Sequence, residues 1–287
     1  MDILYLMIAI LPFVFGMALK VLTTPPSEGI SISGARIFFS VPMPIQDMLI
    51  TESQINSWLV IISLFGLCLY FTHGLNPHPT LKRQHIVEWI VKSCQGLVKT
   101  NMGEYFSAYA PFVAAILGLS AFSSLSALVG LYPPTSDINV TAGWAIFVFI
   151  LITYYKMKCG IVQYVKGFGD PVAFLAPLNV IGEVATPVSM AFRHYGNVLS
   201  GAVISVLIAT GLSGLSEMLL GWLPGFLGDF PFLRIGLPAV LSIYFDVFSG
   251  LLQAYIFAML TMLYVSSGFP KEEYEKRKAA KLSKKIK

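Results

Sequence analysis

One arginine, Arg193, lies inside a stretch that otherwise has the composition of a helix for a membrane interior, residues 187–208. A guanidinium keeps its charge at every accessible pH. Placing that charge at the centre of a bilayer costs about 3 kcal/mol on insertion scales, so such a residue faces other protein or water. The sequence therefore predicts an electrostatic site at Arg193, within the membrane.

Polar residues accompany this arginine along one face of the predicted helix. Ser189, Arg193 and Asn197 are spaced four residues apart, which places them on the same side of an α-helix. In the last apolar stretch, also predicted to be a helix, Asp246 and Gln253 are seven apart and again lie on one face. Two such polar seams are expected to face each other or a third partner.

The two acidic residues of these segments lie on opposite sides of the cation. At about 1.5 Å of rise per residue, Glu183 lies roughly 15 Å from Arg193 toward the side where its helix begins. On the antiparallel last helix, Asp246 lies about 10 Å from Gln253 toward the other side. This is the layout of two aqueous half-channels that do not join.

The elements that must position these residues are apolar helices. The 287 residues are 56% hydrophobic and only 12% charged, and the mean hydropathy is +0.74. Stretches long enough for a bilayer occur near 1–22, 55–72, 108–131, 140–155, 188–212 and 235–267. We therefore predict an all-α polytopic membrane protein, with about five core transmembrane helices and an apolar N-terminal segment.

The distribution of basic residues predicts the orientation of these helices. Lysines and arginines gather after the second apolar stretch, after the fourth, and in the tail 271–287. If these regions are cytoplasmic, the positive-inside rule leaves the acidic loops 23–54, 132–139 and 213–231 outside. The Arg193 helix then runs from inside to outside, and the basic C-terminus is cytoplasmic.

The predicted domain organisation is simple. Residues 1–22 have the composition of a signal anchor or of a cleavable signal, and 23–287 read as a single membrane domain with the basic cytoplasmic tail 271–287. Residues 84–100 suit either a helix lying on the inner membrane surface or an ordinary loop helix.

Several functional classes lack their signatures. The sequence has no internal repeat, no GxxxxGK[ST] and no HExxH, so we expect no catalytic residue, no cofactor, no metal and no nucleic acid. A stand-alone ion-coupled transporter usually has an inverted repeat, which argues against that alternative. An intramembrane hydrolase needs a Ser/His or paired Asp site, and the polar residues of the apolar stretches do not provide one.

The stretches "PLNVIGEVATPVSMAFRHYGNVLSG", "LLQAYIFAMLTMLYV" and "PTSDINVT" make the sequence resemble subunit a of the F-type ATP synthases over most of 35–270. The resemblance implies a non-catalytic stator subunit whose two long C-terminal helices, tilted in the membrane, face a rotating c-ring. It passes H⁺, or in an alternative version Na⁺, to and from a carboxylate on each ring subunit. A peripheral-stalk subunit b and a bacterial plasma membrane are the further partner and location implied.

The resemblance also assigns residues. It implies that Arg193 is the essential stator arginine, that Gln253 is its polar neighbour on the last helix, and that Asn197 is the motif asparagine. The further positions implied are Glu183 and Asn179 on the inner side and Asp137 in the outer turn.

Two positions depart from the family pattern. Where the family often has an acid and a histidine, in either order, this chain has Ala202 and Asp246, so the outer path depends on Asp246 alone. His194 occupies a position that is usually leucine. Its side chain points about 100° away from Arg193, which favours a packing role over proton relay.

Overall fold

The computed structural model describes residues 1–23, 34–44, 46–75, 82–158, 160–169, 172–222, 233, 236, 240–241 and 243–269. The predicted basic tail 271–287 lies outside these residues. Eight α-helices within them carry the fold. They are α1 (Asp2–Thr23), α2 (Glu52–Thr72), α3 (Lys82–Met102), α4 (Ala110–Leu125), α5 (Ile138–Met157), α6 (Ile161–Gly167), α7 (Ala176–Leu220) and α10 (Gly250–Ser267).

The prediction of an all-α membrane protein is confirmed. Among the described residues, six helical segments are long and apolar enough to cross a membrane: 2–23, 52–72, 104–129, 138–157, 176–220 and 243–267. The third and sixth of these extend α4 and α10 with the short helical turns that flank them.

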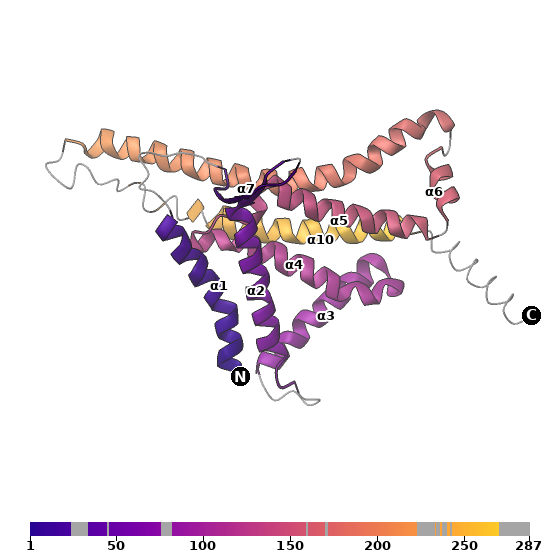
Figure 1. Cartoon of the computed structure of the whole chain (residues 1–287), viewed down its shortest axis with the longest axis horizontal. Coiled ribbons are helices and arrows are strands. Elements are labelled where there is room, and N and C mark those ends of the chain that lie inside the picture. The colour runs from indigo at the N-terminus through magenta and orange to yellow at the C-terminus, as the bar shows by residue number, and fades with distance from the viewer. Residues whose placement is uncertain are drawn as a thin grey trace, which may run out of the picture.

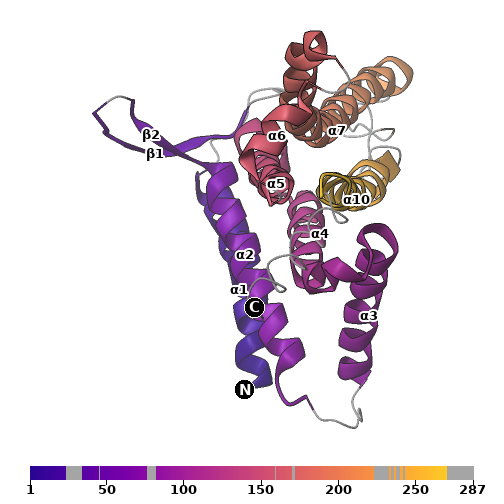
Figure 2. The same cartoon turned by 90° about the vertical axis from the view of Figure 1, so that its right-hand side faces the viewer.

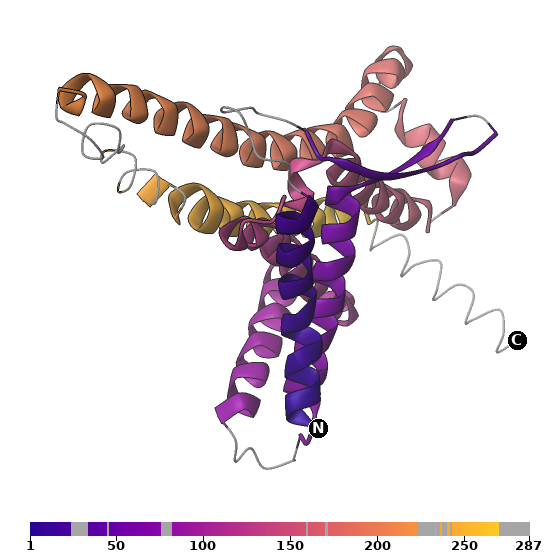
Figure 3. The same ribbon diagram turned by 60° about the vertical axis from the view of Figure 1, so that its left-hand side comes forward.

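The helices form two groups that cross each other. Helices α1 and α2 lie side by side, whereas α5, α7 and α10 run across them (Figures 1 and 3). Figure 2 looks almost along the axes of α5 and α10, with α4 beside them. The buried core lies where α3, α4, α5, α7 and α10 meet. It includes Val98, Phe106, Val113, Val148, Met190, Phe257, Met262 and Val265.

Helix α7 is much longer than the sequence indicates. It has 45 residues, so at about 1.5 Å per residue it is about 68 Å long, more than twice the roughly 30 Å of a bilayer core. Pro187 lies inside it and does not divide it, although the proline removes one backbone hydrogen bond and favours a bend. Figure 1 shows α7 as two arms with different directions.

Helices α1 and α2 approach each other closely at a glycine. A Cβ atom at Gly66 would lie 2.6 Å from the backbone nitrogen of Ala9, so only glycine fits this crossing. Asp2, at the start of α1, pairs with Arg83 at 3.2 Å. Near the end of the same helix, Lys20 donates to the carbonyl of Gly130. Contacts along its whole length therefore hold α1 against the rest of the chain.

A β-hairpin interrupts the segment that the sequence indicates as a plain outer loop. Strands β1 (Ile37–Val41) and β2 (Met48–Thr51) pair antiparallel. At their base, Arg36 pairs with Glu52 at 2.9 Å. The hairpin projects from the end of α2 (Figure 2).

Candidate functional site

Arg193 lies on the exposed side of α7. Its neighbours Ala191 and His194 are buried against the other helices, and Phe192 is exposed. Because successive residues of an α-helix turn by about 100°, burying His194 directs Arg193 away from the core. No ion pair to Arg193 is formed among the described residues. The predicted Ser189 is exposed one turn earlier, on the same side of the helix.

The polar seam of α7 meets the last helix at Asn197. Its side-chain amide donates to the Ser249 hydroxyl at 2.8 Å, and that hydroxyl donates to the amide oxygen of Asn197 at 3.1 Å. One turn further along α7, a Cβ at Gly201 would lie 3.1 Å from the ring of Phe245. This small residue allows close packing, so the polar seam of α7 is joined to the start of the last helix here, one turn from Arg193.

The expectation of one continuous α-helical face in the last helix is wrong. Residues Ile243–Ser249 form a π-helix, and the α-helix starts only at Gly250. A π-helix has wider turns with i→i+5 hydrogen bonds, so the seven-residue spacing no longer fixes Asp246 and Gln253 on one α-helical face. Gln253 is buried, with 4% of its surface exposed, and Asp246 is half-buried.

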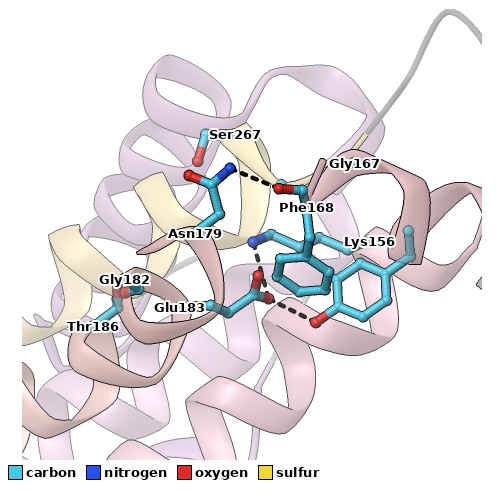
Figure 4. Close-up of a pocket in the computed structure, with 10 residues that line it drawn as sticks. Lys156, Gly167, Phe168, Asn179, Gly182, Glu183, Thr186 and Ser267 are labelled. Carbon is cyan, nitrogen blue, oxygen red and sulfur yellow. Dashed lines mark hydrogen bonds and ion pairs between the residues drawn. The ribbon is translucent and has the colours of Figure 1, made fainter. Parts of the chain in front are cut away.

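A pocket of about 560 Å³ opens on the side of α7 where the helix begins. Glu183 points into it (Figure 4). The Glu183 carboxylate accepts a hydrogen bond from the Tyr164 hydroxyl at 2.9 Å and pairs with the Lys156 ammonium at 3.0 Å. Burial is the main cause that raises the pKa of Tyr164 above its usual value, and the hydrogen bond to Glu183 raises it further. The hydroxyl therefore stays protonated and remains a hydrogen-bond donor.

The short helix α6 covers this pocket. The Asn179 side chain donates to the carbonyl of Phe168 at 2.8 Å (Figure 4). The structure thus brings together Glu183 and Asn179, both predicted from the sequence. It adds Lys156 and Tyr164, which were missed because Lys156 reads as one more basic residue of a cytoplasmic loop and no motif marks Tyr164.

Asp137 lies on the opposite side of the fold, at the turn between α4 and α5. Its carboxylate accepts from the backbone nitrogen of Asn139 at 2.9 Å and caps the start of α5. It also accepts from the Ser53 hydroxyl on α2. These two bonds give Asp137 a structural role in the turn.

His194 is completely buried between four helices. Its Nε2 atom lies 3.3 Å from the Ser120 hydroxyl of α4. Trp144 of α5 and Phe257 of α10 contact its ring edge-to-face, with centroids 5.8 and 5.6 Å away. Ser120 was not among the predicted residues, although its position inside an apolar stretch is a signal.

A family model described as the ATP synthase A chain matches residues 54–266, which include every predicted site residue. This chain belongs to the ATP synthase subunit a family. It is a membrane-sector subunit of an F-type ATP synthase and a multi-pass membrane protein. Helix α1 lies before the matched region.

Curated members of the subunit a family are similar to this chain over most of their own length. The ATP synthase subunit a of Alkalihalophilus pseudofirmus is 35% identical over 71% of this chain and 85% of its own. The Priestia megaterium protein of the same name is 32% identical, over 76% and 92%. The Moorella thermoacetica subunit a is 29% identical over 80% of this chain and 94% of its own.

Proposed function

We propose that this subunit is the ion-conducting stator of the synthase. Arg193 separates two half-channels, of which one opens to each side of the membrane. The observation that carries the proposal is an arginine on the exposed side of a membrane helix, α7, where Val188 and Phe192 are also exposed. A permanent cation at such a position faces other protein or water, and a negatively charged partner would stabilise it. A ring of c subunits, each with a carboxylate, would be such a partner.

Arg193 would act through charge alone. A guanidinium does not release its proton, so protons do not pass through it from one half-channel to the other. Its charge favours the ionised form of a ring carboxylate that comes close, and the carboxylate gives up its proton on one side. Each proton that crosses the field contributes about 2.3 kcal/mol per 100 mV, which drives rotation in one direction.

The polar groups that lie before and after Arg193 along α7 suit the two half-channels. The Glu183 pocket would be the inner half-channel, with Asn179 at its lining. Asp246 and the Asn197–Ser249 pair would belong to the outer one. The chain itself would be non-catalytic, would contact the c-ring and a peripheral-stalk subunit b, and would reside in a bacterial plasma membrane.

The identity of the ion is tested by choosing the gradient. In vesicles containing the assembled synthase, we expect an imposed pH gradient with a membrane potential to drive ATP synthesis in Na⁺-free buffer, and a proton ionophore to abolish it. Synthesis that requires a Na⁺ gradient and survives the ionophore would replace H⁺ by Na⁺. No synthesis under either gradient, from a complex of full composition, would contradict the stator function.

The orientation is tested by chemical labelling. In a background without Cys68, Cys94 and Cys159, a cysteine replacing exposed Asn139 at the start of α5 should react with an impermeant thiol reagent from outside intact cells. A cysteine replacing exposed Lys166 of α6 should react only in inverted vesicles. The reverse pattern would exchange the inner and outer half-channels.

A further inference from the structure

The β-hairpin presents an exposed apolar face. In the pairing of β1 with β2, Phe39 lies opposite Ile50 and Val41 lies opposite Met48. Residues two apart in a strand point to the same side of it, and opposite residues of paired strands share that side, so these four side chains form one face. Phe39, with 64% of its surface exposed, Val41 and Met48 are all exposed. Ser40 lies on the other face. The four apolar residues are called the apolar face below.

The hairpin has few of the charges that suit an element surrounded by water. Between Arg36 and Glu52, Asp47 is the only charged residue of the sequence, and Arg36 and Glu52 pair with each other. An isolated two-stranded hairpin is marginally stable in water, and proteins usually protect exposed strands with charged side chains. An apolar face on such a hairpin therefore indicates that a partner covers it.

The base of the hairpin lies at the boundary of the membrane. Strand β2 ends at Thr51, and α2, which is long and apolar enough to cross a membrane, begins at the next residue, Glu52. The backbone nitrogen of Glu52 donates to the carbonyl of Arg36 at 2.7 Å. Ser53 donates to Asp137, which caps the start of α5, so two membrane helices begin at the same level. The hairpin is fixed at that level.

The hairpin leaves this boundary sideways. It runs across the direction of α2 instead of continuing it (Figures 2 and 3), so it lies along the surface of the bilayer. On α2 itself, Trp58, Ile61 and Ile62 are exposed. Lipid chains are the surroundings that suit such side chains within a membrane, and tryptophan is enriched at the level of the headgroups. The apolar face thus continues the lipid-facing surface of α2.

The backbone of the hairpin limits how deep it can lie. Within the described residues, β1 pairs only with β2, so each strand has one edge whose N–H and C=O groups point away from the hairpin. Hydrocarbon offers these groups no hydrogen bond, whereas the headgroup region offers water, phosphate and ester oxygens. The free edges disfavour hydrocarbon and the apolar face disfavours water. The boundary between headgroups and acyl chains satisfies both.

We propose that the hairpin is a lipid-binding element that lies in the headgroup region at the start of α2, the outer side in the proposed orientation, with its apolar face toward the acyl chains. Phe39 is then buried about 5–10 Å into the boundary between headgroups and chains, as in other interfacial elements. The Arg36–Glu52 ion pair fastens the hairpin to α2 and so holds the end of this helix at a constant depth. The inference depends on the membrane location of the subunit and not on the ion that it conducts.

The first test measures depth with nitroxide labels, in synthase reconstituted into phosphatidylcholine vesicles and without other reactive cysteines. Phe39→Cys and Ser40→Cys place labels on opposite faces of one strand. Ile62→Cys places a label about 15 Å along α2 from its start, deep in lipid. The label's collision rate with oxygen, which concentrates in lipid, is divided by that with a water-soluble nickel chelate. We expect this ratio at Phe39→Cys to exceed that at Ser40→Cys at least about threefold and to stay below that at Ile62→Cys.

Two results of this measurement would overturn the proposal. A ratio at Phe39→Cys as low as that at Ser40→Cys would place the apolar face in water. Low collision rates with both reagents at Phe39→Cys would show that protein covers the face, which would make another subunit or a second copy of this chain the occupant.

The second test identifies lipid itself as the occupant. A fluorophore attached to Phe39→Cys should be quenched by phosphatidylcholine that carries bromine near the start of its acyl chains, and about twofold less or weaker by lipid brominated near the chain ends. Ile62→Cys should show the opposite preference. No quenching at Phe39→Cys, with Ile62→Cys quenched as expected, would refute the lipid contact. Neither test needs ion flow, so a negative result in either leaves the stator function standing.

Discussion

Replacing Arg193 by alanine should abolish ion-driven ATP synthesis while the complex still assembles. The side chain is exposed and not part of the buried core, so the main loss is its charge. Two unit charges 4 Å apart interact by about 4 kcal/mol at an effective dielectric constant of 20, and every 1.4 kcal/mol is a factor of ten. We therefore expect synthesis by vesicles to fall at least about a hundredfold.

The conservative variant separates charge from geometry. Arg193→Lys should also lose most of its synthesis, because an ammonium lacks the planar fork of the guanidinium and can deprotonate in an apolar setting. As a control, Lys92→Ala removes an exposed cation of α3 that pairs with Glu88 on the same helix, and synthesis should be unchanged. Coupled synthesis at the wild-type rate in Arg193→Ala vesicles would refute the assignment.

Asp246→Asn should have the second largest effect, a loss of passive proton conductance with assembly intact. Asparagine keeps the shape and the hydrogen-bonding capacity of the side chain but cannot ionise, so it cannot take up and release a proton. With Ala202 in place of a second titratable group on α7, no neighbour there substitutes for it. We expect conductance to fall at least about tenfold. This is a conservative lower bound, because a general acid or base typically contributes about a hundredfold or more.

Companion variants make this result specific. Asp246→Glu should retain more conductance than Asp246→Asn, and adding Ala202→His should restore part of what a weakened variant loses. Glu217→Gln removes an exposed acid near the outer end of the same α7 and should conduct like wild type. If Asp246→Asn itself conducts protons like wild type across the working pH range, the outer path runs through other groups and Asp246 is structural.

The apolar helices could be predicted from the sequence because burial in a bilayer imposes a simple composition on about twenty residues at a time. The length of α7 could not. The sequence indicates an apolar stretch only at 188–212, yet Asn179, Glu183 and Pro187 all lie inside the same continuous helix. Proline disfavours a helix interior but does not exclude it where packing compensates.

The arrangement of the candidate site was predictable only within single helices. The four-residue spacing of Ser189, Arg193 and Asn197 fixes their common face in any α-helix. The π-helix at Ile243–Ser249 has no such signal, since a spacing of seven looks the same before the backbone is known. Contacts between helices, such as Lys156 with Glu183, depend on packing that a linear pattern does not encode.

The close crossing of α1 and α2 at Gly66 bears on the order in which the chain is built. These two helices are neighbours in sequence, so they can pair as soon as both have left the ribosome, and such local contacts form fast. Helix α10 follows much later: at roughly 5–20 residues per second, synthesis takes about ten seconds or longer to pass from Thr72 to Gly250. Asn197 is itself synthesised late in that interval and pairs with Ser249 only after α10 begins to emerge, so the surroundings of Arg193 are among the last parts of the subunit to be completed.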